Sequence, residues 1–328
     1  MRKILFLIVF IFQITTIRQL GAKELNIVTT LPSLASITEN IGGEFIEVFS
    51  ITRGVQDAHY VEAKPSYMVK LNKADLLIYS GLELEIGWLP LLIQGARNDE
   101  ITVGSQGNLN ASLALSSDKI LEKPRGEVDR SMGDVHPAGN PHYLLNPHNC
   151  IPVAELIADK LVQLDPNHKI EFKQNLEQFI KDIETQINVL ETTAAYLKGL
   201  DVVCYHVHWS YLLDWLGIKS VGFIELRPGI PPTPKHKIEI IKLMEEKNIK
   251  VVIISSWKEP TKAQEVANSV KAELLILPGE VNAMPGSESY PIWINYLVTQ
   301  LVNAVPEDIL LNNNQEQKRN RERKRGTK

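Results

Sequence analysis

Short apolar runs alternate with amphipathic stretches along most of the chain, beginning at Leu25. The runs have the length of buried strands, and the stretches between them carry apolar residues at helical spacing. Strands that alternate with helices favour an α/β fold in which parallel sheets are covered by helices on both faces. The predicted strands are Leu25–Thr29, Phe45–Ile51, Asp75–Tyr79, Ile101–Val103, Val202–Tyr205, Ser220–Ile224, Val251–Ser255 and Leu274–Leu277.

The longest amphipathic pattern begins near Pro166 and ends near Leu197. It predicts one helix of roughly 30 residues, or about 45 Å at 1.5 Å per residue. Helices in globular proteins average about 11 or 12 residues, so a helix this long in mid-chain is suited to connecting two lobes. The other predicted helices are Pro32–Ile41, Pro65–Leu71, Trp88–Ala96, Asn149–Leu164, Trp209–Trp215, Pro234–Lys247, Thr261–Val270 and Pro291–Val305.

The 328 residues exceed the usual length of one domain and divide into two similar α/β lobes. We expect an N-terminal lobe over 23–165, the connecting helix over 166–198 and a C-terminal lobe over 199–311. Residues 105–140 break the rhythm, because they are rich in Ser, Gly, Asp and Lys and lack periodicity. A structureless segment of this length predicts a mobile or functional loop.

Both ends of the chain differ from its body. Residues 1–22 combine a basic start, an apolar run and a small-residue exit, which indicates a cleaved secretory signal peptide. The apolar run of about 11 residues is shorter than the roughly 20 that a spanning helix needs, although an uncleaved anchor is the alternative. Residues 312–328 are polar, basic and low in complexity, which predicts a disordered tail.

Without these two ends, residues 23–311 hold 25 basic and 37 acidic side chains. An acidic body argues against nucleic-acid binding, which needs a basic face, and it is compatible with a cationic ligand. Cys150 and Cys204 are the chain's two cysteines. Export would permit a disulfide between them, but two buried free thiols are the favoured interpretation.

Three of the eight histidines are candidate ligands, and two of them lie beyond the carboxyl ends of strands, where ligands of open α/β sheets bind. His59 follows the second predicted strand, His142 follows the mobile loop, and His206 directly follows a strand. Neutral imidazoles of this kind suit zinc. His208 is the alternative to His206, and we expect only one of the two to reach the site.

A carboxylate would complete a tetrahedral site and offset one positive charge. Glu280, after the last predicted strand, is the first candidate for this fourth ligand. Glu225, which follows Ser220–Ile224, and a water molecule are the alternatives. Asp57 and Glu62 are the residues expected to orient the ring of His59 from outside the ligand set.

Five segments in order along the chain share a common pattern with one protein family. They are DAHYVEAKPS at 57–66, ADLLIYSGLELE at 74–85, GNPHYLLNP at 139–147, YHVHWSY at 205–211 and GIPPTPKH at 229–236. Together they resemble the zinc/manganese substrate-binding proteins of bacterial metal ABC importers, solute-binding protein family 9, in its zinc-type branch. Two departures are Asn146, where the family usually has Asp, and Ser255-Ser256, where many members have a Glu.

The resemblance implies two lobes, each with a four-stranded parallel sheet and flanking helices, joined by one long rigid helix. It also implies a metal held in the cleft between the lobes. The family's ligands carry over onto His59, His142 and His206, with a carboxylate or water near Glu280. Members of the family often carry a metal-capturing loop before the second histidine, and here that loop contains His136 and Asp134. Transient capture by these residues is a hypothesis, and a plain solvated loop is the favoured alternative.

These observations predict a non-enzymatic, monomeric, periplasmic protein. It would capture a divalent transition metal with high affinity, zinc before manganese, and deliver it to the membrane permease of an ABC importer, with a periplasmic metallochaperone as an optional intermediary. Affinity should fall as the pH drops through about 6.5, because the imidazoles must be neutral to bind. The rivals are an exported zinc hydrolase, although H-E-x-x-H is missing, and a metal-containing adhesin.

Overall fold

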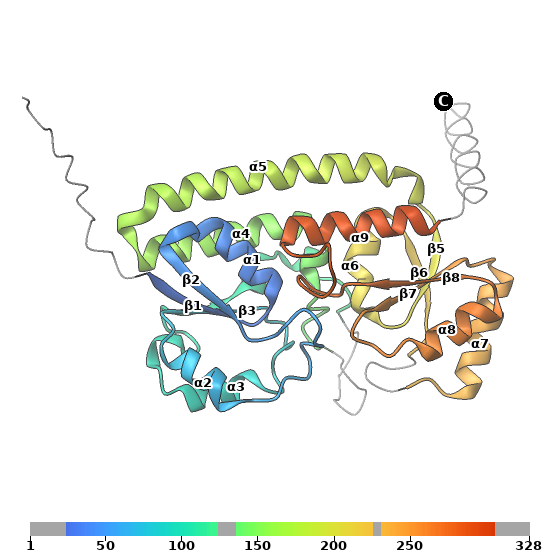
Figure 1. Ribbon diagram of the computed structural model, residues 1–328, viewed down its shortest axis with the longest axis horizontal. Helices are drawn as coiled ribbons and strands as arrows, with labels where there is room; N and C mark the ends of the chain where they lie inside the picture. Colours follow the sequence, from blue (N-terminus) through green and yellow to red (C-terminus); the bar gives the residue numbers. More distant parts are fainter. Residues whose placement is uncertain (1–23, 124–135, 226–230, 306–328) are drawn as a thin grey trace, which may run out of the picture.

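The computed structural model describes residues 24–123, 136–225 and 231–305, which form two α/β lobes side by side (Figure 1). The expected signal peptide (1–22) and basic tail (312–328) lie outside the described residues. Each lobe contains a four-stranded parallel sheet, with strand orders β2-β1-β3-β4 and β6-β5-β7-β8. The predicted fold class is therefore confirmed, whereas the residue boundaries that we drew between lobes and helix remain a prediction.

Seven of the eight strands occur where the apolar runs predicted them. In the first lobe they are β1 (Leu25–Thr29), β2 (Ile46–Ser50) and β3 (Leu76–Tyr79). In the second lobe they are β5 (Asp201–Cys204), β6 (Lys219–Phe223), β7 (Val251–Ser255) and β8 (Glu273–Leu277). The central strands are buried on both faces, as parallel sheets covered by helices require.

The prediction of the fourth strand at Ile101–Val103 was wrong. A 3-10 turn (Asp99–Ile101) ends at the first residue of that segment. Ile101 is fully buried in the core of the first lobe, so its apolar character reflects burial and not a strand. The strand is β4 (Asn108–Asn110), which pairs with β3 at the sheet edge. Only its central residue is buried, so three residues with polar ends give no strand signal in the sequence.

The segment 105–140 is also more ordered than its composition predicted. Besides β4, it contains 3-10 turns at Ala111–Ala114 and Ser117–Lys119, while residues 124–135, including Asp134, lie outside the described residues. The first turn is fixed by Asn110, whose side-chain oxygen accepts a hydrogen bond from Ser112 N at 3.1 Å. Short polar turns of this kind have no periodicity that a sequence pattern could reveal.

Nine α-helices surround the sheets within the described ranges. They are α1 (Pro32–Gly42), α2 (Pro65–Asn72), α3 (Leu89–Ala96), α4 (Pro147–Leu164), α5 (Lys169–Thr193), α6 (Ser210–Leu216), α7 (Pro234–Glu246), α8 (Thr261–Ser269) and α9 (Tyr290–Ala304). At the start of α4, Asn146 still caps the helix by accepting a hydrogen bond from His148 N at 3.1 Å. The departure from the family's Asp therefore preserves the local structure.

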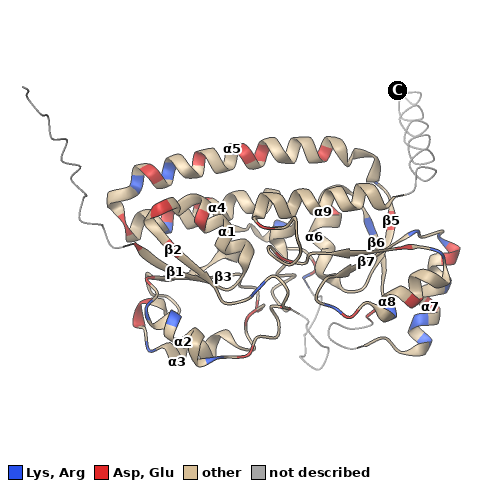
Figure 2. Cartoon of the chain, in the orientation of Figure 1, with Lys and Arg blue, Asp and Glu red and all other residues tan. Residues whose placement is uncertain are grey.

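Helix α5 extends across the first lobe and over part of the second (Figure 1). It has 25 residues, or about 37 Å of helix, and it packs on α1 and α4 of the first lobe and on α9 of the second. Its buried face belongs to one apolar core that includes residues of both sheets. Acidic and basic residues are spread along α5 (Figure 2), and nearly all of them are exposed. The lobes are thus held by a continuous core as well as by the chain.

Cys150 and Cys204 are both free and buried, which confirms the favoured interpretation. Within the described ranges, no helix has the length and apolar character needed to cross a membrane.

Candidate metal centre

Five histidines converge between the two lobes. The ring of His59 lies 5.2 Å from that of His136, 5.3 Å from that of His142 and 6.3 Å from that of His206, measured between ring centroids. The rings of His142 and His208 are 4.1 Å apart. The first lobe supplies the first three of these side chains and the second lobe supplies His206 and His208. Two of the five, His59 and His206, follow the carboxyl ends of strands β2 and β5.

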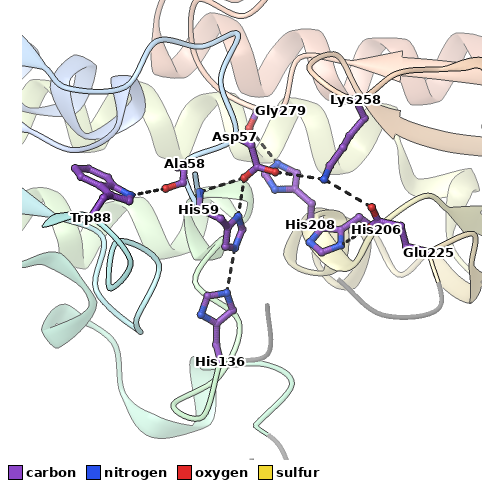
Figure 3. A network of polar contacts seen from close by, with 10 residues as sticks. All are labelled: Asp57, Ala58, His59, Trp88, His136, His206, His208, Glu225, Lys258 and Gly279. Carbon is purple, nitrogen blue, oxygen red and sulfur yellow. Dashed lines mark hydrogen bonds and ion pairs between the residues drawn. The ribbon is translucent and has the colours of Figure 1, made fainter. Parts of the chain in front are cut away.

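His59 is held by a carboxylate and by its own loop. Its Nδ1 lies 2.7 Å from Asp57 Oδ1, which also accepts a hydrogen bond from His59 N at 3.1 Å. A carboxylate at Nδ1 makes this nitrogen the protonated one, so Nε2 carries the lone pair. The loop is fixed in turn by Trp88, whose Nε1 donates to Ala58 O at 2.8 Å (Figure 3).

The prediction that Asp57 orients His59 is therefore confirmed, while Glu62 pairs with Lys64 at 3.8 Å instead. Burial tends to raise the pKa of the Asp57 carboxyl. The hydrogen bond and charge of His59, together with the charge of Lys258, outweigh burial and hold this pKa well below its usual range.

The expectation that only one of His206 and His208 reaches the site was wrong. A 3-10 turn (Val207–Trp209) follows His206, and both side chains are buried among the other histidines. His208 Nε2 lies 3.0 Å from Gly279 O, whereas His206 Nδ1 lies 2.9 Å from Glu225 Oε2. His206 therefore keeps its Nε2 for another partner, which favours it as a ligand.

The surroundings keep two of these rings neutral. Burial, followed by the nearby charges of other histidines, lowers the pKa of His142 well below its ordinary value. Burial likewise lowers the pKa of His208 to about 3. A neutral imidazole is the form that binds a metal ion, so burial keeps His142, the candidate ligand of this pair, in its binding form.

Glu280 lies in the loop after β8 and is buried. Its carboxylate accepts hydrogen bonds from Ser33 N and Ser33 Oγ, both at 3.0 Å, and from Val281 N at 2.8 Å. Burial raises the pKa of Glu280 to about 7, despite these hydrogen bonds. Glu225, its rival in the sequence, instead contacts His206, and apart from that 2.9 Å approach its buried Oε2 has no hydrogen-bond partner.

Sequence reasoning missed Lys258, which approaches the centre from the loop after β7. Its Nζ lies 3.3 Å from Asp57 Oδ2 and 3.7 Å from Glu225 Oε1 (Figure 3). A signal was available, because Lys258 follows the carboxyl end of a predicted strand, as the histidines do. Lys258 was not considered because a protonated lysine repels a cation and does not bind it.

The side chains lie close together without forming a complete ligand set. Across residues 24–123, 136–225 and 231–305, no group of three or more His, Cys, Asp or Glu is arranged to hold a metal ion. The lone-pair nitrogen of His59 lies 3.1 Å from His136 Nε2. The set His59, His142, His206 and Glu280 therefore stays a prediction.

The comparison with known families decides what kind of centre this is. Residues 27–304 match the family model described as zinc-uptake complex component A, periplasmic. The chain belongs to this family. Its members are metal-binding, non-enzymatic components of ABC importers that lie outside the cytoplasm. The resemblance inferred from the five segments is therefore confirmed, and so is the prediction of a non-enzymatic protein.

The relatives differ in the metal that their names state. The chain is 33% identical over 244 residues to the manganese ABC transporter substrate-binding lipoprotein PsaA of Streptococcus pneumoniae, covering 72% of this chain and 73% of PsaA. It is 24% identical over 251 residues to the zinc-binding lipoprotein AdcA of S. pneumoniae strain R6, covering 76% of this chain and 48% of AdcA. The manganese lipoprotein scaA of Streptococcus gordonii is 31% identical over 166 residues, but this match spans about half of each chain, 50% of this one and 49% of scaA.

Solved structures share the fold at lower identity. A zinc-bound deletion mutant of ZnuA superposes with a TM-score of 0.71 at 20% identity, covering 85% of this chain and 97% of that one. A manganese-bound periplasmic metal-binding protein of Candidatus Liberibacter asiaticus superposes with a TM-score of 0.67, also at 20% identity, covering 84% of this chain and 98% of that one. At this identity the likeness supports the two-lobed fold and leaves the metal open.

Proposed function

We propose that the protein captures one zinc ion outside the cytoplasm and delivers it to the membrane permease of an ABC importer. The observation that carries the proposal is the convergence of His59, His142 and His206 from both lobes, with the Nδ1 atoms of His59 and His206 each facing a carboxylate. This leaves Nε2 of those two rings as the lone-pair nitrogen. Glu280 is the proposed fourth ligand.

The donor set supports zinc over manganese. Three imidazoles and one carboxylate match the tetrahedral nitrogen-rich sites of zinc, whereas manganese prefers more oxygen ligands. The relatives carry both metals in their names, so manganese is the alternative within the same function. The acidic body supports cation capture by raising the local concentration of cations, an effect that salt screens.

For Glu280 to bind the metal, its carboxylate must turn away from Ser33 and lose its proton where the pH is below about 7. For His59 to bind, His136 must leave its Nε2 or share the ion. Both steps are local changes of side chains and loops. They are compatible with lobes that α5 and a shared core hold together.

The test is zinc binding by the metal-free mature protein, measured by competition with a chromogenic chelator. We expect one tightly bound zinc and no turnover of ester or peptide substrates. His59→Ala, His142→Ala and His206→Ala should each weaken binding by at least about tenfold. His148→Ala removes an exposed histidine on α4 and serves as the control that keeps wild-type affinity.

His208→Gln and Glu280→Gln then separate the alternatives. His208 already contacts Gly279 O, so His208→Gln should retain most of the affinity, while Glu280→Gln should lose it. One-to-one binding that survives unchanged in His206→Ala would contradict the proposed site. A protein that binds neither zinc nor manganese would contradict the function.

A further inference from the structure

Lys258 is the one cation whose ammonium group the described structure places against both carboxylates that flank the candidate ligands. Asp57, 3.3 Å from Nζ, comes from the first lobe and orients His59. Glu225, 3.7 Å from Nζ, comes from the second lobe and lies against His206. The lysine side chain is 21% exposed and Glu225 is 6% exposed, so the three charges interact where water screens them poorly.

The position is unusual for a protein that collects cations. A fixed positive charge beside the site repels a divalent metal, and so it opposes the affinity that the acidic body provides. Lys258 Nζ pairs with the oxygen of each carboxylate that does not face a histidine, Asp57 Oδ2 and Glu225 Oε1. Without this charge, those two oxygens would be available to a metal ion beside the candidate ligands. Glu225 is the sharper case, since its Oε2 has no hydrogen-bond partner and lies 2.9 Å from His206 Nδ1.

Carboxylate oxygens and imidazole nitrogens favour different metals. Adding an oxygen donor to a nitrogen-rich set moves its preference from zinc toward manganese. A residue that keeps Glu225 and Asp57 paired therefore protects the nitrogen-rich character of the site without touching the metal.

We infer that Lys258 is a selectivity residue, which holds the carboxylates of Asp57 and Glu225 outside the ligand set and so keeps the centre selective for zinc over manganese. The inference rests on the proposed function, because it assigns the origin of the metal preference at that same site. It also makes Lys258 an ionic link between the lobes, since its two partners lie in loops of different lobes.

The experiment measures the dissociation constants of zinc and manganese separately, by chelator competition on the mature protein, and compares their ratio between variants. Lys258→Met keeps the length of the side chain and removes the charge. We expect it to reduce the preference for zinc over manganese by at least about tenfold, mainly through tighter manganese binding. Lys258→Arg keeps the charge and should stay near the wild-type ratio.

Two further variants identify the freed donor and exclude a general effect. Glu225→Leu in the Lys258→Met background should restore the wild-type ratio, because it removes the oxygen donor at position 225. Lys262→Met removes an exposed lysine at the start of α8 and should change neither constant. Lys258→Gln repeats the removal of charge with a smaller side chain and replaces Lys258→Met if that protein does not fold.

The outcomes separate this inference from the proposed function. If the wild type binds zinc one-to-one but Lys258→Met and Lys258→Gln keep its metal ratio within twofold, the selectivity role is refuted while the capture function stands. A loss of both metals by the same factor in Lys258→Met, with rescue by Lys258→Arg, also refutes selectivity and assigns Lys258 to lobe alignment alone. A wild type that binds neither metal overturns both.

Discussion

Two buried groups beside the centre should give the metal-free protein opposite responses to pH. The pKa of His208 is lowered from 6.5 to about 3, so the folded protein holds this ring neutral while the unfolded chain protonates it below about pH 6.5. Its contribution to stability is complete above that pH and is lost as the pH falls. The pKa of Glu280 is raised from 4.5 to about 7, so the folded protein keeps its proton where the unfolded chain does not. Its contribution is complete below about pH 4.5 and is lost as the pH rises through 7.

The magnitudes follow from the two shifts. Between pH 7 and pH 5, protonation of the unfolded chain at His208 should cost about 2 kcal/mol of unfolding free energy. Over the same interval, protonation of folded Glu280 should add about 2 kcal/mol. The two effects oppose each other, so together they leave the free energy of unfolding of the wild type nearly unchanged between pH 7 and pH 5. Burial also lowers the pKa of His142, which reduces stability at low pH in the same direction as His208.

Two variants separate the pH-dependent contribution of His208 to stability from that of Glu280. The free energy of unfolding is measured by urea titration at pH 7 and pH 5 with a chelator present. Relative to wild type, His208→Gln should gain about 2 kcal/mol on going from pH 7 to pH 5, and Glu280→Gln should lose about 2 kcal/mol. Glutamine can still donate to Gly279 O at 208 and bond Ser33 at 280, so both contacts have a substitute. His148→Gln controls for the loss of an exposed histidine. Equal pH responses of wild type and both variants would refute this account of burial.

Two further predictions concern a buried glycine and the two buried cysteines. Gly54 is buried where the loops of the two lobes meet, and a Cβ there would press on the backbone of Val281 and Ala283. Gly54→Ala should therefore lower the free energy of unfolding by about 1–3 kcal/mol and weaken zinc binding, as thermal unfolding and chelator competition would check. The control Gly87→Ala, whose Cβ would meet only His59 O at 3.9 Å, should change neither. Burial raises the pKa of Cys204 to about 12 and that of Cys150 further. Iodoacetamide should therefore label neither thiol in the native protein and both thiols in urea. Mass spectrometry that finds native labelling or a disulfide would contradict this prediction.

The elements of the fold could be predicted where burial leaves a periodic trace. Seven strands and the long helix α5 carry buried residues at regular spacing, so their positions followed from the pattern. The strand β4 could not be found this way, since it exposes both ends and depends on pairing with β3. The turn that carries both His206 and His208 into the centre was missed for the same reason, because local periodicity says nothing about how a chain bends after a strand.

The sequence by itself determined the two-lobed α/β architecture and the family, and it named three candidate histidines, because these depend on patterns local in the chain or on segments shared with relatives. Only the tertiary structure decided what surrounds those histidines. Asp57, Glu225 and Lys258 are about 30 to 200 residues apart in sequence, and their interaction arises when two sheets face each other across a common core. Coulomb interactions and desolvation depend on distance and burial in space, and it is these that set the charges around the centre.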